Sequence, residues 1–235
     1  MSNRRASFAV VVASGLGVAA FAAVASGQSS DYYPGCPDTT RTIVGTEGPD
    51  TIDGTVAAEL ILTLGGNDVA DGQGNRDCIL LGPGNDGGTG SGQADRVDGE
   101  AGRDRVAGGE ASDTVLGGSG NDTVKGNPGN DRLSGEDGND TVSGGPGNDR
   151  VRGNSGNDKT YGGGGRDTVA GGPGNDFVRG DDGRDSMSGG SGNDRINAFD
   201  QTRDRSVNCG PGRDRAVIDR IDPVSRNCEV VVRRR

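Results

Sequence analysis

An acidic residue returns at every ninth position through the middle of the chain. The positions are Asp50, Glu59, Asp68, Asp77, Asp86, Asp95, Asp104, Asp113, Asp122, Asp131, Asp140, Asp149, Asp158, Asp167, Asp176, Asp185 and Asp194. Carboxylates are hard oxygen donors, and Ca²⁺ in proteins is held by about six to eight oxygens from side chains and backbone carbonyls. Short polar residues also favour turns, but turn preference does not require an acid at one fixed position in every repeat. The spacing therefore predicts a periodic array of cation sites.

The composition excludes several other chemistries. The chain has no His and no Trp, so a Ser-His-Asp triad or a zinc site with His ligands cannot form. A pair of carboxylates can hydrolyse a glycosidic bond, but here the acids belong to one regular array. Only short segments flank that array, and neither is long enough for a catalytic domain. We predict that the protein is not an enzyme.

A unit of nine residues positions each acid. One Gly usually stands five residues before the acid and another stands two before it. An aliphatic residue such as Val106, Val115 or Val124 usually follows two residues after the acid. The unit reads G-x-x-G-x-D-x-U-x, where U is aliphatic. Its x-U-x half predicts a short strand with U facing inward. Its Gly-rich half predicts a sharp turn, because Gly adopts positive φ and lets another backbone pass close by.

This unit closely resembles the calcium-binding nonapeptide of the RTX, or haemolysin-type, family. The resemblance spans residues 45–197 and is fullest at 144–149 and 171–176, which both read G-G-P-G-N-D. The second Gly of the family pattern is replaced in several repeats, as at Asn127, Glu136, Asn154 and Asp181. The resemblance implies an all-β fold, a right-handed parallel β-roll. Two repeats would form one coil of eighteen residues, with Ca²⁺ between stacked turns.

In such a roll, acids eighteen residues apart share an edge. One edge would carry Asp50, Asp68, Asp86, Asp104, Asp122, Asp140, Asp158, Asp176 and Asp194, and the other Glu59, Asp77, Asp95, Asp113, Asp131, Asp149, Asp167 and Asp185. The resemblance makes all of these aspartates candidate metal ligands. It also makes candidate carbonyl ligands of two glycines in each of the best repeats: Gly117, Gly120, Gly126, Gly129, Gly135, Gly138, Gly144, Gly147, Gly153, Gly156, Gly162, Gly165, Gly171, Gly174, Gly180 and Gly183. One turn offers too few oxygens for Ca²⁺, so two stacked turns would share each ion.

The composition also predicts how the repeats fold. Gly provides 47 of the 235 residues, hydrophobic residues are 29%, and the net charge is −10. One aliphatic side chain per nine residues buries little surface against the cost of ordering a Gly-rich backbone, and stacked carboxylates repel one another. We expect the chain to be largely disordered without Ca²⁺ and to fold on binding several ions. A permanently disordered acidic tract is the alternative, although it would not need an aliphatic residue in each repeat.

The two ends differ from the repeats. Arg4 and Arg5 precede an apolar stretch that ends at Ala23-Val24-Ala25, which predicts a signal peptide over residues 1–25; an uncleaved N-terminal anchor is the alternative. Residues 26–44 form a lead-in, 45–197 the β-roll and 198–235 a C-terminal cap, with Asp219 and Asp222 as surface charge. The cysteines are Cys36, Cys78, Cys209 and Cys228. They allow three disulfide pairings. We favour the local one, Cys36 with Cys78 and Cys209 with Cys228, over the other pairings or free thiols, because it would clamp both ends.

These features predict a secreted or cell-surface, non-catalytic calcium-binding protein with a structural or interaction role. A calcium-dependent adhesion or matrix module that binds a glycan or another extracellular protein is the alternative. An ice-binding face is disfavoured because Thr51, Thr123 and Thr141 share their repeat position with Arg105 and Arg195. The acidic middle of the chain disfavours nucleic acid. After signal cleavage, no segment is apolar enough to cross a membrane.

Overall fold

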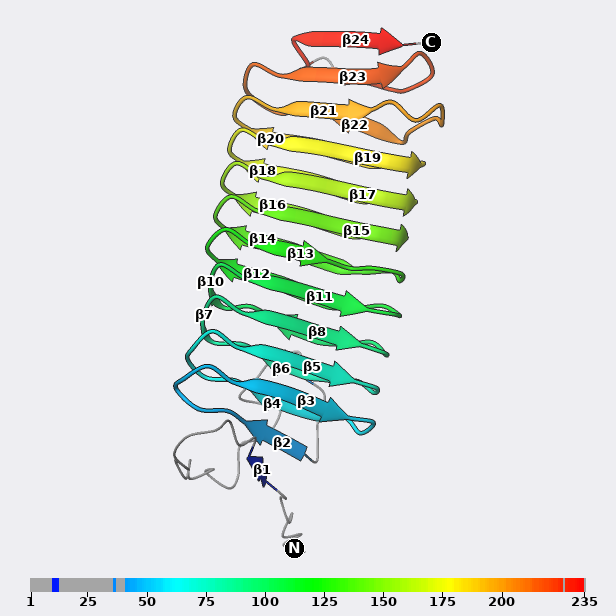
Figure 1. The fold of residues 1–235 in the computed structure, drawn as a ribbon. Helices are drawn as coiled ribbons and strands as arrows, with labels where there is room; N and C mark the ends of the chain where they lie inside the picture. The colour runs from blue at the N-terminus through cyan, green and yellow to red at the C-terminus, as the bar shows by residue number, and fades with distance from the viewer. Residues whose placement is uncertain (1–9, 13–35, 37–40, 226, 235) are drawn as a thin grey trace, which may run out of the picture.

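The described structure consists of strands that wind through one continuous stack (Figure 1). It is a computed structural model, and it describes residues 10–12, 36, 41–225 and 227–234. Within these residues there is no helix, and so none that could span a membrane. The chain forms a parallel β-solenoid of about eleven turns, which confirms the predicted all-β roll.

The two long faces of the solenoid are parallel sheets. The strands of the first sheet are β1 (Val10–Val12), β2 (Arg41–Val44), β4 (Glu59–Leu62), β6 (Cys78–Leu80), β9 (Arg96–Asp98), β12 (Thr114–Ser119), β14 (Arg132–Asp137), β16 (Arg150–Ser155), β18 (Thr168–Pro173), β20 (Ser186–Ser191) and β22 (Ser206–Asn208), with the short β7 (Pro83–Gly84) and β10 (Ala101–Gly102) beside this path. The strands of the second sheet are β3 (Thr51–Thr55), β5 (Val69–Gln73), β8 (Gly87–Ser91), β11 (Arg105–Gly109), β13 (Thr123–Lys125), β15 (Thr141–Gly147), β17 (Lys159–Gly165), β19 (Phe177–Gly183), β21 (Arg195–Ala198), β23 (Arg215–Asp219) and β24 (Val230–Arg234). Successive strands alternate between the two sheets through most of the chain, so one coil contributes a strand to each.

The register between neighbouring coils is eighteen residues through the repeats. Val115 pairs with Val97 on one side and with Leu133 on the other. These aliphatic residues point inward and are at most 2% exposed. Val106 and Val124 of the second sheet are buried in the same way, so the core consists of one row of side chains from each sheet. Thr160 occupies one inward position and is fully buried. The period-two alternation of a strand explains the pattern, because only the central residue of each x-U-x segment faces the interior.

The stack continues past both ends of the repeat segment predicted at 45–197. At the C-terminal end, Met187 pairs with Val207 across twenty residues, so longer turns absorb the extra residues and β22, β23 and β24 add further rungs. Asp219 and Asp222 are each 5% exposed, so the prediction that they are surface charge is wrong. At the N-terminal end, β2 pairs with β4 and β1 pairs with β2.

The N-terminal predictions fall mostly outside the described residues. Of the predicted signal peptide, the structure describes only β1, and of residues 26–40 in the lead-in it describes only Cys36. Both disulfides of the favoured pairing are present: Cys36 with Cys78, Cα atoms 5.4 Å apart, and Cys209 with Cys228, Cα atoms 5.2 Å apart. Each therefore links a flanking segment to the roll.

Candidate metal centre

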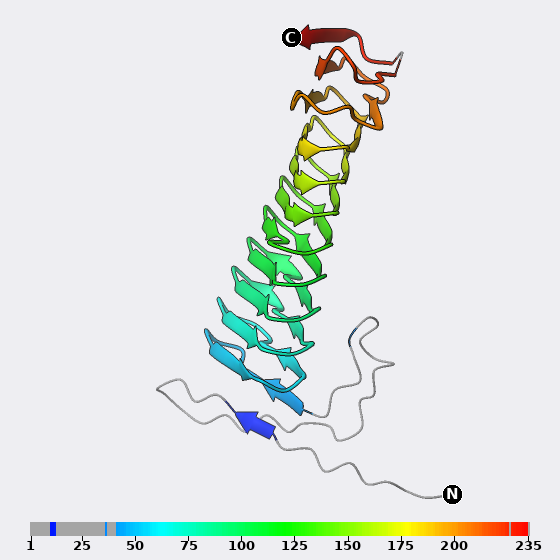
Figure 2. The same cartoon turned by 90° about the vertical axis from the view of Figure 1, so that its right-hand side faces the viewer.

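Figure 2 shows the coils stacked one on another, seen from the side. The aspartates of the repeat are buried in two ladders, one along each edge of this stack. The sixteen predicted aspartates are between 0 and 7% exposed. On each edge, the backbone amide of one acid donates to a carboxylate oxygen of the acid one coil further along. Asp104 donates to Asp122, and Asp122 to Asp140, both at 2.8 Å. The other edge repeats the relation, as Asp131 donates to Asp149 at 2.8 Å. The predicted grouping of acids eighteen residues apart is therefore present.

The second oxygen of each carboxylate has no hydrogen-bond partner. The hydrogen bond from the preceding coil uses Oδ1, whereas Oδ2 is buried and unpaired in every predicted aspartate except Asp50. Fifteen predicted aspartates, at steps of nine residues, therefore each have one hydrogen-bonded oxygen and one unpaired oxygen. Asp214 has the same arrangement. Leaving a buried carboxylate oxygen unpaired is costly, so such a series indicates a ligand that each Oδ2 is positioned to bind.

A Gly five residues before most of these aspartates leaves the space that faces this unpaired oxygen, whereas Thr63 and Leu81 stand at that position before Asp68 and Asp86. A Cβ atom added to Gly117 would lie 2.7 Å from Oδ2 of Asp122 and 2.7 Å from the carbonyl oxygen of Gly135 in the next coil. Gly126 has the same surroundings, formed by Asp131 and the carbonyl of Gly144. Any side chain here would fill the space between the two oxygens. The missing Cβ therefore creates a small cradle lined by a carboxylate and a backbone carbonyl.

The two sets of predicted carbonyl ligands lie beside different carboxylate oxygens. The carbonyl oxygens of the glycines five residues before the acid border the same space as Oδ2, as that of Gly135 does beside Asp122. The glycines two residues before the acid lie nearer to Oδ1: the carbonyl of Gly129 approaches the Cα of Gly147, whose added Cβ would lie 3.2 Å from Oδ1 of Asp149. The first set therefore lies near the unpaired oxygen, and the second lies near the oxygen already bonded to an amide.

The substituted second Gly of the family pattern keeps the backbone shape of glycine. Gly145 has φ of 110°, and Asn127, at the same repeat position, has φ of 73°. Glu136 also adopts the left-handed region, with φ of 78°. Asn tolerates this conformation better than most residues. The turn geometry thus survives the loss of Gly, and the carbonyl of that residue keeps its place in the turn.

Burial raises the pKa values of the laddered acids from Asp77 to Asp204, and repulsion between carboxylates adds to the shift in several of them. Burial raises the pKa of Asp140 to about 7, against the opposing hydrogen bond from the Asp122 amide, and the carboxylates of Asp158 and Asp122 raise it further. Burial likewise raises the pKa of Asp185 to about 8. A carboxylate in this position resists ionisation near neutral pH unless positive charge is supplied. The two ladders are therefore electrostatically suited to divalent cations.

The donor set fits Ca²⁺ and does not fit a zinc-type ion. Among the described residues, no three His, Cys, Asp or Glu side chains cluster closely enough to hold a metal by themselves. Each coil supplies one carboxylate per edge, so the remaining ligands would come from backbone carbonyls. Ca²⁺ accepts such a mixed oxygen set, whereas structural zinc sites use Cys and His, and here all four cysteines form disulfides. The unpaired Oδ2 atoms and the glycine cradles therefore fit calcium.

The ladders extend beyond the acids found by counting nines. After Asp194, the Asp185 amide donates to Asp204 and the Asp194 amide to Asp214, both at 2.8 Å. Asp222 then accepts from the Asp204 amide at 3.0 Å, and Glu229 from the Asp214 amide at 2.6 Å. Spacings of ten residues before Asp204 and Asp214, and of eight and seven before Asp222 and Glu229, hide this continuation from a count of nines.

The two acids at the N-terminal start of the ladders have partners of their own. Oδ2 of Asp50 accepts hydrogen bonds from Thr46, 3.0 Å from its Oγ1. Glu59 accepts from the Thr55 amide at 2.9 Å and pairs with Arg41 at 3.1 Å. Asp50 thus differs from the other predicted ligands, because its second oxygen is satisfied by protein.

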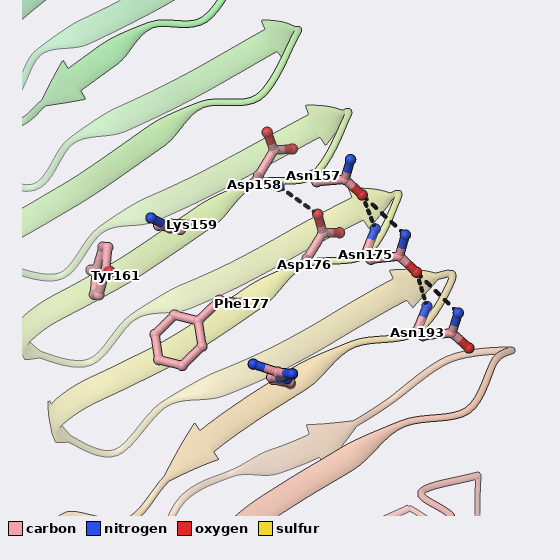
Figure 3. Close-up of a pocket in the computed structure, with 9 residues that line it drawn as sticks. Asn157, Asp158, Lys159, Tyr161, Asn175, Asp176, Phe177 and Asn193 are labelled. Atoms are coloured by element: carbon pink, nitrogen blue, oxygen red, sulfur yellow. Dashed lines mark hydrogen bonds between the residues drawn. The ribbon is translucent and has the colours of Figure 1, made fainter.

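Asparagines form a second ladder that the sequence reasoning missed. In Figure 3, Asn157, Asn175 and Asn193 stack along the turn edge. The Asn175 amide donates to Oδ1 of Asn157 at 2.8 Å, and its Nδ2 donates to the same oxygen at 3.1 Å. These bonds run in the opposite direction to those of the aspartates, since each Asn accepts from the following coil. The repeated Asn-Asp dipeptide was the available signal, with the Asn side chain outside and the Asp side chain inside.

Comparison with protein-family models finds one family along most of the roll. The family is described as the RTX calcium-binding nonapeptide repeat, and its model spans four copies of the repeat. That model matches the chain over residues 42–61, 53–87, 89–124, 125–159 and 161–196. These matches extend from β2 to β21 and include the sixteen aspartates named above. No curated protein matches the chain.

Proposed function

Because the chain belongs to the RTX calcium-binding nonapeptide repeat family, we propose that it is a secreted, non-catalytic protein whose β-roll folds on binding Ca²⁺. Calcium binding is the property of its repeats, and the export, the folding switch and the extracellular role are our proposal. The observation that carries it is the series of buried, unpaired Oδ2 atoms, many of which share a cradle with a glycine carbonyl of the next coil, as Asp122 does with Gly135.

The aspartates and the carbonyls of the cradle would hold the ions. Asp122 with Gly135, and Asp140 with Gly153, exemplify the pairs that successive coils bring together. Bound Ca²⁺ would neutralise the stacked carboxylates and join adjacent coils. The core supports this dependence on metal, because each repeat contributes mainly one inward, mostly aliphatic side chain to it. A folding switch of this kind suits export, since the chain would fold only where Ca²⁺ is abundant.

A non-catalytic role is supported by the same residues. The chain lacks His, and the buried acids belong to continuous ladders rather than to one isolated pair. The apolar stretch before Ala25 and the two disulfides support an oxidising, extracellular destination. An adhesion or matrix role is the second candidate, favoured by the long, regular outer faces of the two sheets.

Far-UV circular dichroism of residues 26–235 during titration with CaCl₂ and then EDTA tests the proposal. We expect a reversible, cooperative change from coil to β-structure with Ca²⁺ and no such change with equal Mg²⁺. A chain that remains coil at millimolar Ca²⁺ would contradict the proposal. A chain already β-structured in EDTA would contradict the folding switch, and direct calcium counting by equilibrium dialysis would then decide whether binding survives.

A further inference from the structure

The two aromatic residues of the repeat region lie side by side on the outer face of the second sheet. Tyr161 and Phe177 are the only aromatic residues between positions 45 and 197. They come from the adjacent strands β17 and β19, with ring centroids 5.8 Å apart. Both are partly exposed, and Figure 3 shows the rings together on the face of the sheet. A chain with so few aromatic residues thus places two of them on one surface.

Positive side chains flank this aromatic pair. Lys159 pairs in register with Phe177, and Phe177 with Arg195, so the three form one row across β17, β19 and β21. Lys159 and Arg195 are exposed, and neither forms an ion pair within the described part of the chain. Arg179, the neighbour of Tyr161 on β19, is by contrast paired with Asp181 at 2.5 Å. Two cations therefore remain available beside the rings.

The Asn ladder borders the same surface with oriented amides. The rings, the two cations and the amides of Asn175 and Asn193 line one open, shallow pocket of about 560 Å³. Nδ2 of Asn193 donates to Asn175 at 3.1 Å. A side-chain amide has two N–H donors, so the ladder fixes each group and leaves the second donor for a ligand.

We propose that this surface, formed by Lys159, Tyr161, Asn175, Phe177, Asn193 and Arg195, binds an acidic carbohydrate chain. Aromatic faces pack against the C–H face of a sugar ring, amides pair with its hydroxyl groups, and Lys and Arg pair with its carboxylate or sulfate groups. Coils repeat at about 4.8 Å along the stack, which is close to the advance per sugar in an extended polysaccharide. Successive coils can thus contact successive sugars.

The inference rests on the proposed calcium function. Asp158 and Asp176 also line the pocket, but both are buried in the ladder. Ca²⁺ bound to these carboxylates would neutralise the buried negative charge beneath the pocket. The charge at the pocket surface would then come from Lys159 and Arg195. Calcium also holds the three contributing coils in register. Acidic carbohydrate is therefore bound only by the calcium-folded protein.

Isothermal titration calorimetry of the mature chain in saturating Ca²⁺ tests this surface. The probes are a hyaluronan hexasaccharide, a heparin-derived hexasaccharide and neutral chitohexaose, with poly-glutamate as an acidic polymer without sugar rings. We expect at least one acidic hexasaccharide to bind about tenfold more tightly than chitohexaose, and poly-glutamate to bind more weakly than that hexasaccharide. EDTA should abolish binding.

Variants separate stacking from charge. Phe177→Ala should weaken all oligosaccharide binding roughly tenfold, while the double variant Lys159→Gln, Arg195→Gln should remove the preference for acidic probes. Thr141→Ala, in the same row one coil before Lys159, is the matched control and should bind as the parent does. The calcium-induced dichroism of every variant is recorded, so that loss of fold is recognised.

Three outcomes would overturn the inference: no oligosaccharide binding, poly-glutamate binding as tight as the acidic sugars, or full binding by both the Phe177→Ala variant and the double variant. If any of these occurs while the parent chain still folds with Ca²⁺, the carbohydrate surface is disproved and the calcium function stands.

Discussion

The backbone amide of Asp122 donates a 2.8 Å hydrogen bond to Oδ1 of Asp140, one coil further along the stack. The same carboxylate leaves its Oδ2 buried and without a partner. One oxygen therefore joins two coils in the protein itself, and the other is available for metal. The two roles can be separated by substitution.

Asp140→Asn should reduce calcium binding and retain the coil-to-coil hydrogen bond. The amide oxygen can still accept from Asp122, but the charge at the Oδ2 position is lost. We expect the calcium stoichiometry, measured by equilibrium dialysis, to fall by one or two ions. Asp140→Ala also removes the acceptor, and should lower the unfolding free energy in Ca²⁺ by about a further 2 kcal/mol.

Asp137→Asn is the matched control for Asp140. It changes the same charge in the same coil, but Asp137 is exposed and lies outside the ladder. The Asp137→Asn variant should bind as many calcium ions as the parent chain. If Asp140→Asn also bound as many as the parent, Asp140 would not be a ligand.

Gly117→Ala should damage the cradle beside Asp122. The added methyl group would lie 2.7 Å from both Oδ2 of Asp122 and the Gly135 carbonyl oxygen, which forces the backbone apart. Overpacking of this kind costs about 1–3 kcal/mol, and calcium affinity should fall with it. The measurement is urea unfolding at saturating Ca²⁺ together with a calcium titration.

Gly164→Ala tests whether the position, rather than the loss of any glycine, matters. A Cβ atom at Gly164 meets nothing within 4 Å, so stability and calcium affinity should match the parent. Equal damage from Gly117→Ala and Gly164→Ala would argue against the cradle.

Acid should partly replace calcium in folding the chain. Burial, opposed by a backbone hydrogen bond in each case, raises the pKa of Asp113 to about 6, of Asp140 to about 7 and of Asp185 to about 8. Because the pKa values are higher in the folded state, protonation favours folding. This stabilisation is full below the ordinary aspartate pKa near 4 and is lost as pH rises through about 6 to 8.

Circular dichroism in EDTA checks the sign of this effect. The β signal should increase as pH falls from 8 to 4, while the Ca²⁺ concentration needed for folding rises because protons compete for the same carboxylates. A metal-free chain that gains structure as pH rises would contradict the assignment.

Asn157→Ala should loosen one edge without removing calcium sites. Oδ1 of Asn157 accepts from both the backbone amide and the side chain of Asn175. The expected cost is about 1–2 kcal/mol, and hydrogen exchange at the Asn175 amide should accelerate. The Asn139 amide, which is bonded to Asn121 at 2.8 Å, should keep its protection. Faster exchange at both amides would indicate general unfolding instead.

Replacing Cys209 and Cys228 by Ser should destabilise the C-terminal coils. The disulfide closes a loop of nineteen residues, and chain-entropy reasoning gives about 3 kcal/mol for a loop of this length. Limited proteolysis in Ca²⁺ should therefore cut first after residue 197 in the double variant. Cleavage beginning within the central repeats would contradict a local clamping role.

Much of the fold follows from one spacing. An acid at every ninth residue, with an aliphatic residue two places later, was sufficient to predict a turn and a short strand with an inward side chain in each repeat. The resemblance to the RTX family supplied the coils of eighteen residues and their two edges. Val115 and Asp122 lie where that reasoning places them. The reason is physical: each coil contacts mainly its neighbours, so the length of the repeat determines which residues pair between coils.

The remaining features depended on contacts that spacing does not encode. Asp204 and Asp214 rejoin the ladders because longer turns absorb extra residues, and a search at a fixed interval misses them. Asp222 was predicted at the surface, but it is buried because it accepts from the Asp204 amide. The division of each carboxylate into a structural oxygen and an unpaired one requires knowledge of which amide faces it.

The last rungs of the two ladders set a rule for the length of this molecule. Along the ladders each coil accepts a carboxylate from its successor, and the final coils are completed by Asp222, eighteen residues after Asp204, and by Glu229, fifteen residues after Asp214. Whole coils of eighteen residues can thus be inserted or deleted inside the array, while the terminal segment must be kept. The length of the solenoid can therefore change only in steps of one coil.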